Sequence, residues 1–330
     1  MITSETPTYK KILYKILDAI KKFFTLDKTY IIGIAIASVL LVVDILVAIL
    51  VGYRTEHKYI YDANVYVIIL ILSFILYLFR LFLTKKKSST DLIIVILAFF
   101  LIWDLSYKLG LITNDILIPS PEGTFHVFEE KSSEIINDIF SSLTLLFWGF
   151  LLGIVLGTLL GLVAGWFSRV RDVVIPISNA ITLIPPLLFS AYLIMLLPTF
   201  KDAAIAIIFF AVFWPTLNST IARVKSIDKK IIEAAKVMGV SNVGMLYKVI
   251  FPYCLPGIIQ SISKSLRGAF MCLAGAEMLG INGGVGYFVE KYKSFADYRV
   301  VLAGIIVIGF ITTIIDIIVQ MVERKVIRWT

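Results

Sequence analysis

Long apolar stretches alternate with short polar segments along this chain. A bilayer core about 30 Å thick needs roughly 20 apolar residues in a helix to cross it. By that measure the pattern predicts eight membrane-spanning helices, at 30–52, 65–84, 91–111, 142–166, 173–198, 202–222, 249–279 and 299–322. The fold class that follows is an all-α polytopic membrane protein.

The composition supports this prediction and narrows the functional classes. Of the 330 residues, 59% are apolar and 16% are charged, whereas an ordinary soluble domain has about 45–50% and about 25%. A soluble enzyme or a nucleic-acid-binding protein is therefore excluded. The two cysteines, Cys254 and Cys272, both lie in apolar runs, so we interpret them as packing residues.

The distribution of lysine and arginine predicts the orientation in the cell membrane. With the N-terminus in the cytoplasm, the cytoplasmic segments carry 21 of these residues and the outer segments carry 8. Cytoplasmic segments are generally the richer in such residues, so both termini are predicted to be cytoplasmic. The stretch 8–24 has apolar residues on one helical face and lysines largely on the other, which suits a helix on the lipid surface or one docked on a partner.

Five glycines at four-residue spacing form one face of the predicted 142–166 helix. Small residues at this spacing let two helix backbones approach closely in lipid. We interpret the face as a packing surface, and contact with a ligand is the alternative. The glycines are Gly149, Gly153, Gly157, Gly161 and Gly165.

The cytoplasmic segment between the sixth and seventh predicted spans is more organised than a polar turn. Asp228 can cap a helix that Gly239 ends, and Ser241 or Asn242 can cap a second short helix. The pattern predicts two short helices at a sharp angle within about 228–247. Such a hairpin can be inserted into a cleft of another protein, with small residues, Ala234 and Ala235, letting the partner approach.

At these residues the chain resembles a known family. EAAKVMG at 233–239, followed by VIFPYCLPGI at 249–258, resembles the EAA signature of the permease subunits of binding-protein-dependent ABC importers. ILIPSPEGTF at 116–125 and the proline-rich 181–196 resemble its nitrate/sulfonate/taurine branch. The resemblance covers about 89–330 as a six-helix permease core and leaves 1–88, with the amphipathic stretch and two extra helices, as an addition.

The resemblance implies partners and a division of labour. The sequence has no GxxxxGK[ST] phosphate loop, so the chain is expected to be no enzyme, to hold no cofactor or metal, and to have no catalytic residue. Two ABC ATPase subunits, an extracytoplasmic substrate-binding protein, a second copy of this chain and the lipid bilayer are the implied partners, and nucleic acid is not. The residues expected to couple the chain to the ATPase are Glu233, Ala234, Ala235, Met238 and Gly239.

Polar and proline residues inside the predicted spans mark a candidate substrate pathway. Adjacent prolines remove hydrogen-bond donors and kink a helix, which membranes tolerate where protein or a water-filled cavity covers the backbone. Intramembrane charges commonly face a cavity or a partner, and snorkelling towards the surface is the alternative for Lys264 and Arg267. The candidate pathway residues are Pro185, Pro186, Ser190, Tyr192, Lys264, Arg267 and Glu277.

The resulting hypothesis is a permease subunit that forms the solute pathway of an ATP-driven importer. The resemblance favours a small anion such as sulfonate, taurine or nitrate as substrate. Three alternatives stay open: an importer of a neutral vitamin or pyrimidine precursor, an ATP-independent channel or secondary transporter, and a membrane scaffold.

Overall fold

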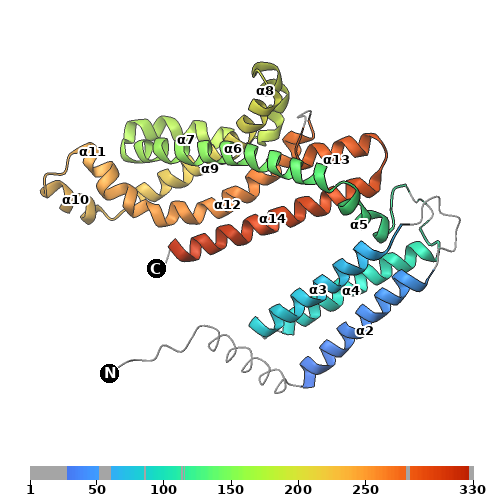
Figure 1. Cartoon of the computed structure of the whole chain (residues 1–330). Coiled ribbons are helices and arrows are strands. Elements are labelled where there is room, and N and C mark those ends of the chain that lie inside the picture. The colour runs from blue at the N-terminus through green and yellow to red at the C-terminus, as the bar shows by residue number, and fades with distance from the viewer. Residues whose placement is uncertain are drawn as a thin grey trace, which may run out of the picture. The chain divides into compact units, whose positions relative to one another are not determined.

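The computed structural model describes residues 28–51, 61–84, 87–112, 114, 116–279 and 283–326 (Figure 1). Throughout these residues the regular structure is helical. Within the described ranges seven helices are long and apolar enough to cross a membrane, and a bent pair of helices is an eighth candidate. This confirms the all-α polytopic fold. The amphipathic stretch at 8–24 lies outside the described residues.

The chain divides into two compact units, residues 1–130 and 131–330. The first contains α2 (Lys28–Leu50), α3 (Asn64–Thr84), α4 (Lys87–Lys108) and α5 (Pro121–Glu130). In its interior the ring of Phe125 lies 5.7 Å from that of Tyr66 and 5.8 Å from that of Phe100, which ties α5 to α3 and α4. The structure thus groups α4 and α5 with the two extra helices, and the boundary near residue 88 stays a prediction.

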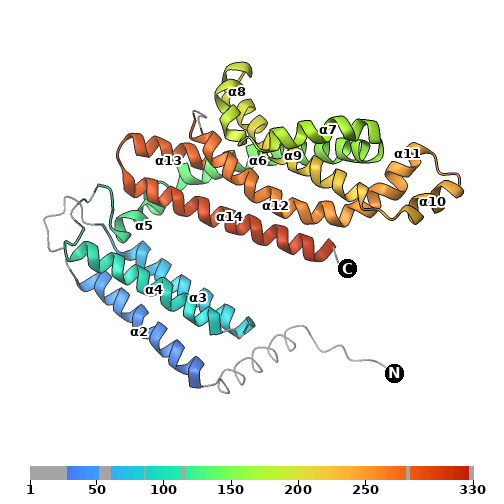
Figure 2. The ribbon, with the colours of Figure 1, turned by 180° about the vertical axis from the view of Figure 1, so that it is seen from behind.

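The second unit is a bundle of long helices with short connecting elements (Figures 1 and 2). Its elements are α6 (Ser132–Trp166), α7 (Ser168–Thr182), the 3-10 segment η1 (Pro186–Phe189), α8 (Ser190–Leu196), α9 (Phe200–Lys225), α10 (Lys229–Val237), α11 (Asn242–Gly244), the π-helical turn η2 (Met245–Ile250), α12 (Phe251–Glu277), α13 (Val285–Ser294) and α14 (Tyr298–Val326).

The closest helix pair of this unit is α6 with α9, and the glycine face lies between them. A Cβ atom placed on Gly161 would lie 2.6 Å from the Cβ of Thr220, and one on Gly149 would lie 2.7 Å from the Cβ of Ile208. The other three glycines of the face meet α9 in the same way. The packing interpretation is confirmed, because α9 itself occupies the space that side chains would need.

The predicted 173–198 span is interrupted at its two adjacent prolines. The structure ends α7 at Thr182, begins η1 at Pro186, and bends the segment by 87° between them, so that α8 projects away from α7 (Figure 2). The physical reason is the predicted one, since Pro185 and Pro186 have no backbone N–H to continue the helical hydrogen bonds.

The fourth predicted span is longer than the apolar pattern indicates. The pattern starts it at 142, whereas α6 starts at Ser132. The additional turns carry polar side chains that bind α13: Glu134 accepts hydrogen bonds from Lys291 Nζ (2.6 Å) and the Tyr292 hydroxyl (2.8 Å). Tertiary contacts therefore extend the helix beyond its apolar stretch.

Candidate coupling hairpin and transport pathway

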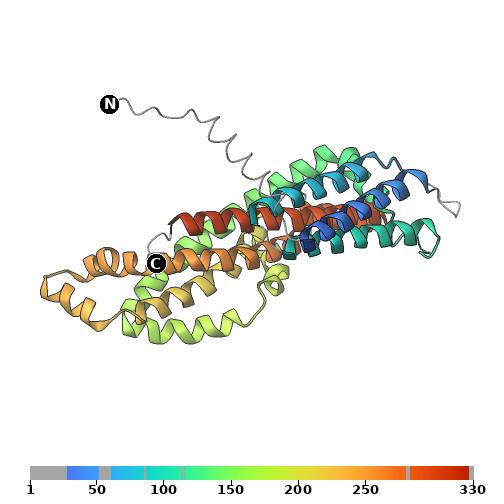
Figure 3. The ribbon, with the colours of Figure 1, turned by 90° about the horizontal axis from the view of Figure 1, so that it is seen from below.

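Two short helices, α10 and α11, connect α9 to α12 and form the 228–247 hairpin (Figure 3). Asp228 Oδ1 accepts a hydrogen bond from the Lys230 N–H at 2.9 Å, and Ser241 Oγ accepts one from the Gly244 N–H at 3.2 Å. Gly239 has φ of 73°, a left-handed conformation that glycine adopts without strain and that commonly ends a helix. Both caps and the glycine stop follow the sequence prediction.

One face of the hairpin packs against the chain itself. Ala235 is only 3% exposed and belongs to an apolar cluster with Ile227, Met245, Ile250 and Cys254. The small side chain of Ala235 therefore packs in the core of this chain. The sequence had predicted instead that its small size lets a partner protein approach. Ala234 and Glu233 are exposed.

The opposite face presents apolar side chains that contact little of the described chain. Val237 is 89% exposed and Met238 is 74% exposed, and Val243 and Tyr247 are largely exposed as well. In Figures 1 and 2 α10 and α11 lie at the end of the second unit, where α9 leads in and α12 leads out. Exposed apolar clusters of this kind mark surfaces that bind a partner.

The base of the hairpin is fastened to the long helices on either side. The guanidinium of Arg223, near the end of α9, packs directly against Gly257 of α12, where a larger residue would collide with it. The turn η2 then joins the hairpin to α12 as a π-helical segment, a form often found at functional sites. The hairpin is therefore joined directly to both α9 and α12.

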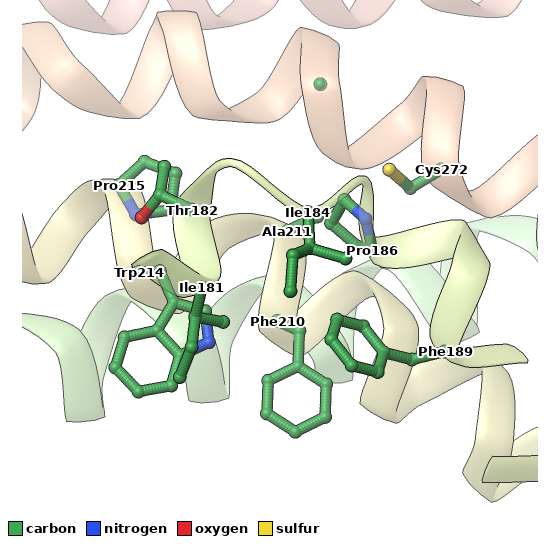
Figure 4. A pocket seen from close by; sticks show the side chains of 11 residues that line it. Ile181, Thr182, Ile184, Pro186, Phe189, Phe210, Ala211, Trp214, Pro215 and Cys272 are labelled. Atoms are coloured by element: carbon green, nitrogen blue, oxygen red, sulfur yellow. The ribbon is translucent and has the colours of Figure 1, made fainter. Parts of the chain in front are cut away.

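A cavity of about 200 Å³ lies beside the bend between α7 and η1 (Figure 4). The rings of Phe189, Phe210 and Trp214 form one part of its wall, and Pro186, Pro215 and Cys272 contribute others. The remaining lining residues are Ile181, Thr182, Ile184, Ala211 and Gly268. None of these eleven described residues is charged.

The structure brings only part of the predicted pathway set to this cavity. Pro186 lines it, and Pro185 directly precedes Pro186 in the bend. Ser190 is buried at the start of α8, and Tyr192 is largely exposed on the same helix. The lining of the cavity therefore supports a pathway role for the proline bend, whereas it includes neither Ser190 nor Tyr192 of α8.

The two basic residues of α12 differ in their surroundings. Arg267 makes two contacts with Asp316 of α14, from Nε to Oδ1 at 2.8 Å and from Nη2 to Oδ2 at 3.2 Å. Asp316 also accepts a hydrogen bond from Gln320. Lys264 is exposed, and within the described part of the chain it has no ion pair.

Glu277 organises the turn between α12 and α13. Its Oε1 accepts a hydrogen bond from the Ser142 hydroxyl at 2.5 Å and its Oε2 accepts one from the Gly286 N–H at 2.8 Å. Ser142 Oγ in turn accepts the Val285 N–H at 2.9 Å, and Asp138 Oδ1 accepts the Gly284 N–H at 2.9 Å. These side-chain oxygens accept the free N–H groups at the start of α13, so Glu277 holds the turn between the two helices.

Glu134 extends the contact between α6 and α13. Its hydrogen bond holds the pKa of Lys291 above the ordinary value, because the carboxylate favours the charged ammonium. With Tyr292 on the same carboxylate, α13 is held to α6 along its length.

Comparison with known proteins agrees with this architecture. The family described as "Binding-protein-dependent transport system inner membrane component" matches residues 153–328, which is more than half of the chain. The matched region contains the hairpin, the proline bend and the cavity. The chain belongs to this family.

Individual relatives indicate the branch of the family to which the chain is most similar. The chain is 30% identical over 230 residues to the putative aliphatic sulfonates transport permease protein SsuC of Bacillus subtilis, and the match covers 69% of this chain and 83% of the relative. It is 29% identical to the taurine transport system permease protein TauC of Escherichia coli (57% and 69% covered). It is 28% identical to the nitrate import permease protein NrtB of Leptolyngbya laminosa (54% and 64% covered).

These comparisons confirm the resemblance that the EAAKVMG segment indicates. The protein is an ABC-type transport permease subunit of the sulfonate, taurine and nitrate branch and not an enzyme. Its family works with a binding protein, as the family description states.

Sequence reasoning missed the aromatic side of the cavity. Phe210 and Trp214 lie one turn apart on α9, and Phe189 comes from η1. In sequence they look like ordinary residues of an apolar span. Pro215 inside α9 was the available signal, because a proline within a membrane helix often marks a functional break.

Proposed function

We propose that this permease is driven by a separate ABC ATPase that binds the 228–247 hairpin. The observation that carries the proposal is the division of the hairpin into two faces. Ala235 anchors the inner face in the permease core, while Val237 and Met238 leave an apolar tip open for a partner. A rigid hairpin of this kind transmits the movement of the ATPase to α9 and α12, as in alternating access.

The assembly that follows has two copies of this chain, two ATPase subunits and one extracytoplasmic binding protein. Both termini and the hairpin lie on the cytoplasmic side of the cell membrane, in keeping with the excess of lysine and arginine there. The residues proposed to act at the ATPase contact are Glu233, Ala234, Met238 and Gly239, with Ala235 as the anchor. An ATP-independent channel would not need this hairpin, which makes the hairpin the place to test.

The test replaces Val237, which is exposed and has no packing role in the chain. Val237→Asp is expected to abolish ATP-driven uptake in proteoliposomes that contain the permease, the ATPase and the binding protein. Val237→Thr keeps the shape of the side chain and is the matched control, with uptake close to that of the unaltered protein. Uptake unchanged in Val237→Asp would overturn the proposal.

For the substrate, we propose a small anion of the sulfonate, taurine or nitrate type. The names of the relatives support this class. Lys264, exposed on α12, supplies a positive charge that can attract an anion, while the charge of Arg267 is matched by Asp316. Lys264→Gln is then expected to weaken uptake of an alkanesulfonate, whereas Lys264→Arg preserves it.

A second candidate substrate is a neutral ring compound, such as a vitamin or pyrimidine precursor. The uncharged lining of the cavity and its three aromatic rings favour this class. The indole N–H of Trp214, which has no acceptor among the described residues, offers a hydrogen bond to a ring nitrogen or carbonyl. Inhibition of uptake by neutral pyrimidines, and none by alkanesulfonates or nitrate, would favour this candidate over the anion.

A further inference from the structure

The first unit buries a group of ionisable side chains that the transport proposal does not use. Lys108 Nζ donates to Asp104 Oδ2 at 3.2 Å, to Glu122 Oε1 at 2.8 Å and to the carbonyl of Val47 at 2.8 Å. These groups come from α4, α5 and α2, and Lys108, Asp104 and Glu122 are each 1–2% exposed. We call Asp44, Tyr66, Asp104, Lys108 and Glu122 the buried acid cluster.

Asp44 is the carboxylate of the cluster for which the described residues supply no hydrogen-bond donor. It is 1% exposed, and neither of its carboxyl oxygens receives a hydrogen bond from the described chain. It lies one turn before Val47 on α2, and both residues are on the buried face of that helix. Electrostatic interactions couple it to Asp104 and to Tyr66.

Other oxygen atoms of the cluster are also unsatisfied. Asp104 Oδ1, Glu122 Oε2 and the hydroxyl of the fully buried Tyr66 have no hydrogen-bond partner in the described residues. Together with Asp44 the cluster holds five such oxygens. Buried polar atoms in folded proteins are nearly always paired, so this concentration needs an explanation.

The charge of the cluster points to the missing component. Two carboxylates, Asp104 and Glu122, contact the one ammonium of Lys108, and Asp44 adds a third carboxylate to the cluster. An ionised carboxylate inside an apolar unit is very unfavourable without a counter-charge or hydrogen-bond donors. Either a cation or a proton removes the excess charge. No set of three or more His, Cys, Asp or Glu side chains in the described ranges is arranged to hold a metal ion.

We propose that the buried acid cluster is a proton-binding site and that Asp44 carries the proton. Uptake converts the Asp44 carboxylate to a neutral carboxylic acid, and release returns the proton to water without any other bond changing. The neutral acid adds an O–H donor to a group of oxygens in which the Tyr66 hydroxyl is the other one. Of the titratable groups on the neighbouring helices, Asp104 of α4 and Tyr66 of α3 interact with Asp44. Lys108 of α4 and Glu122 of α5 pair with each other within the cluster, and Tyr107 and His126 are the next titratable residues on α4 and α5.

Infrared spectroscopy of the full-length permease in lipid tests the proposal. A buried neutral carboxyl gives a carbonyl stretch that an ionised carboxylate lacks. We expect this band at neutral pH, a shift of the band after growth on aspartate labelled with ¹³C in the side-chain carboxyl, and its loss in Asp44→Asn. Asp91→Asn, the same change at an exposed aspartate of α4, is the matched control and keeps the band.

Every outcome of the infrared measurement either supports or overturns the assignment of the proton to Asp44. Absence of the band at neutral pH, or a band that labelled aspartate leaves unmoved, overturns the proposal without any variant. A band that appears only when sodium is removed assigns the site to a metal cation instead. Should Asp44→Asn fail to fold, Asp44→Glu gives the deciding measurement, because the band must then move from the labelled aspartate to labelled glutamate.

Discussion

Two glycines of this permease have different physical reasons for lacking a side chain. Gly161 lies where α6 and α9 touch, and the space that a Cβ would take is filled by Thr220. At Gly239 nothing lies within 4 Å of a Cβ, but φ is 73°. Substitution at Gly161 therefore affects packing, whereas substitution at Gly239 affects backbone conformation.

The packing reason predicts a loss of stability in Gly161→Ala. Forcing a methyl group against Thr220 is expected to cost about 1–3 kcal/mol of unfolding free energy. Thermal unfolding in mild detergent measures the effect. Gly309→Ala, on α14 with open space around it, is the control and gains up to about 1 kcal/mol from helix propensity. Equal melting temperatures for the two variants would contradict the tight α6–α9 contact.

The conformational reason predicts that Gly239→Val impairs coupling while Gly239→Asn is tolerated. A β-branched residue in the left-handed region costs of order 1–3 kcal/mol and displaces the tip of the hairpin, whereas asparagine adopts this conformation readily. ATP-driven uptake, with membrane insertion checked in parallel, separates the two variants. Equal uptake would show that the left-handed turn is dispensable.

At the scale of elements, hydrogen bonds between distant segments hold the helix ends in place. Ser142 of α6 donates to Glu277 at the end of α12 and accepts from the N–H of Val285 at the start of α13. One hydroxyl thus links three helices in a buried position. A buried N–H that loses its acceptor costs about 1–3 kcal/mol.

Ser142→Ala is therefore expected to loosen the turn that leads into α13. Hydrogen–deuterium exchange of the peptide containing 283–294 should become at least several-fold faster. Thr144→Ala is the matched control, because that hydroxyl donates to the Phe140 carbonyl of its own helix and its removal should leave the exchange unchanged. The same exchange rate in Ser142→Ala as in the unaltered protein would mean that Glu277 holds the turn alone.

Features that depend on the local sequence could be predicted, whereas features that depend on contacts between distant segments could not. The caps at Asp228 and Ser241, the stop at Gly239 and the break before Pro186 follow from single residues whose backbone preferences act locally. The start of α6 at Ser132 and the buried acid cluster depend on pairing between distant segments, such as Glu134 with Lys291 and Glu122 with Lys108. A charged residue in sequence does not reveal its partner, so these contacts needed the structure. Ala235 shows the same limit. The sequence indicated that a small side chain matters there, but not that this side chain faces the core of the permease.

At the scale of the whole molecule, the proposed orientation assigns each connecting segment to one side of the membrane. In the proposed orientation the 228–247 hairpin faces the cytoplasm and the segment that precedes α5 faces the outside. Charge bias supports this arrangement, with 21 lysines and arginines on one side against 8 on the other.

Cysteine labelling tests the orientation directly. In a chain with Cys254→Ala and Cys272→Ala, a membrane-impermeant maleimide is expected to label Leu117→Cys in intact cells. Val243→Cys, which is exposed on the hairpin, should be labelled only after the cells are opened. Labelling of Val243→Cys in intact cells would reverse the orientation and remove the hairpin from the ATPase.

The central claim is that the permease binds an ABC ATPase through the exposed tip of the hairpin. The most direct measurement is to purify the tagged protein from its native host in mild detergent and to determine the stoichiometry of what accompanies it. The account predicts an ATPase subunit in equal amount with the unaltered protein and with Val237→Thr, and its loss with Val237→Asp. Recovery of a correctly folded permease without an ATPase, or an ATPase retained in full by Val237→Asp, would contradict the account.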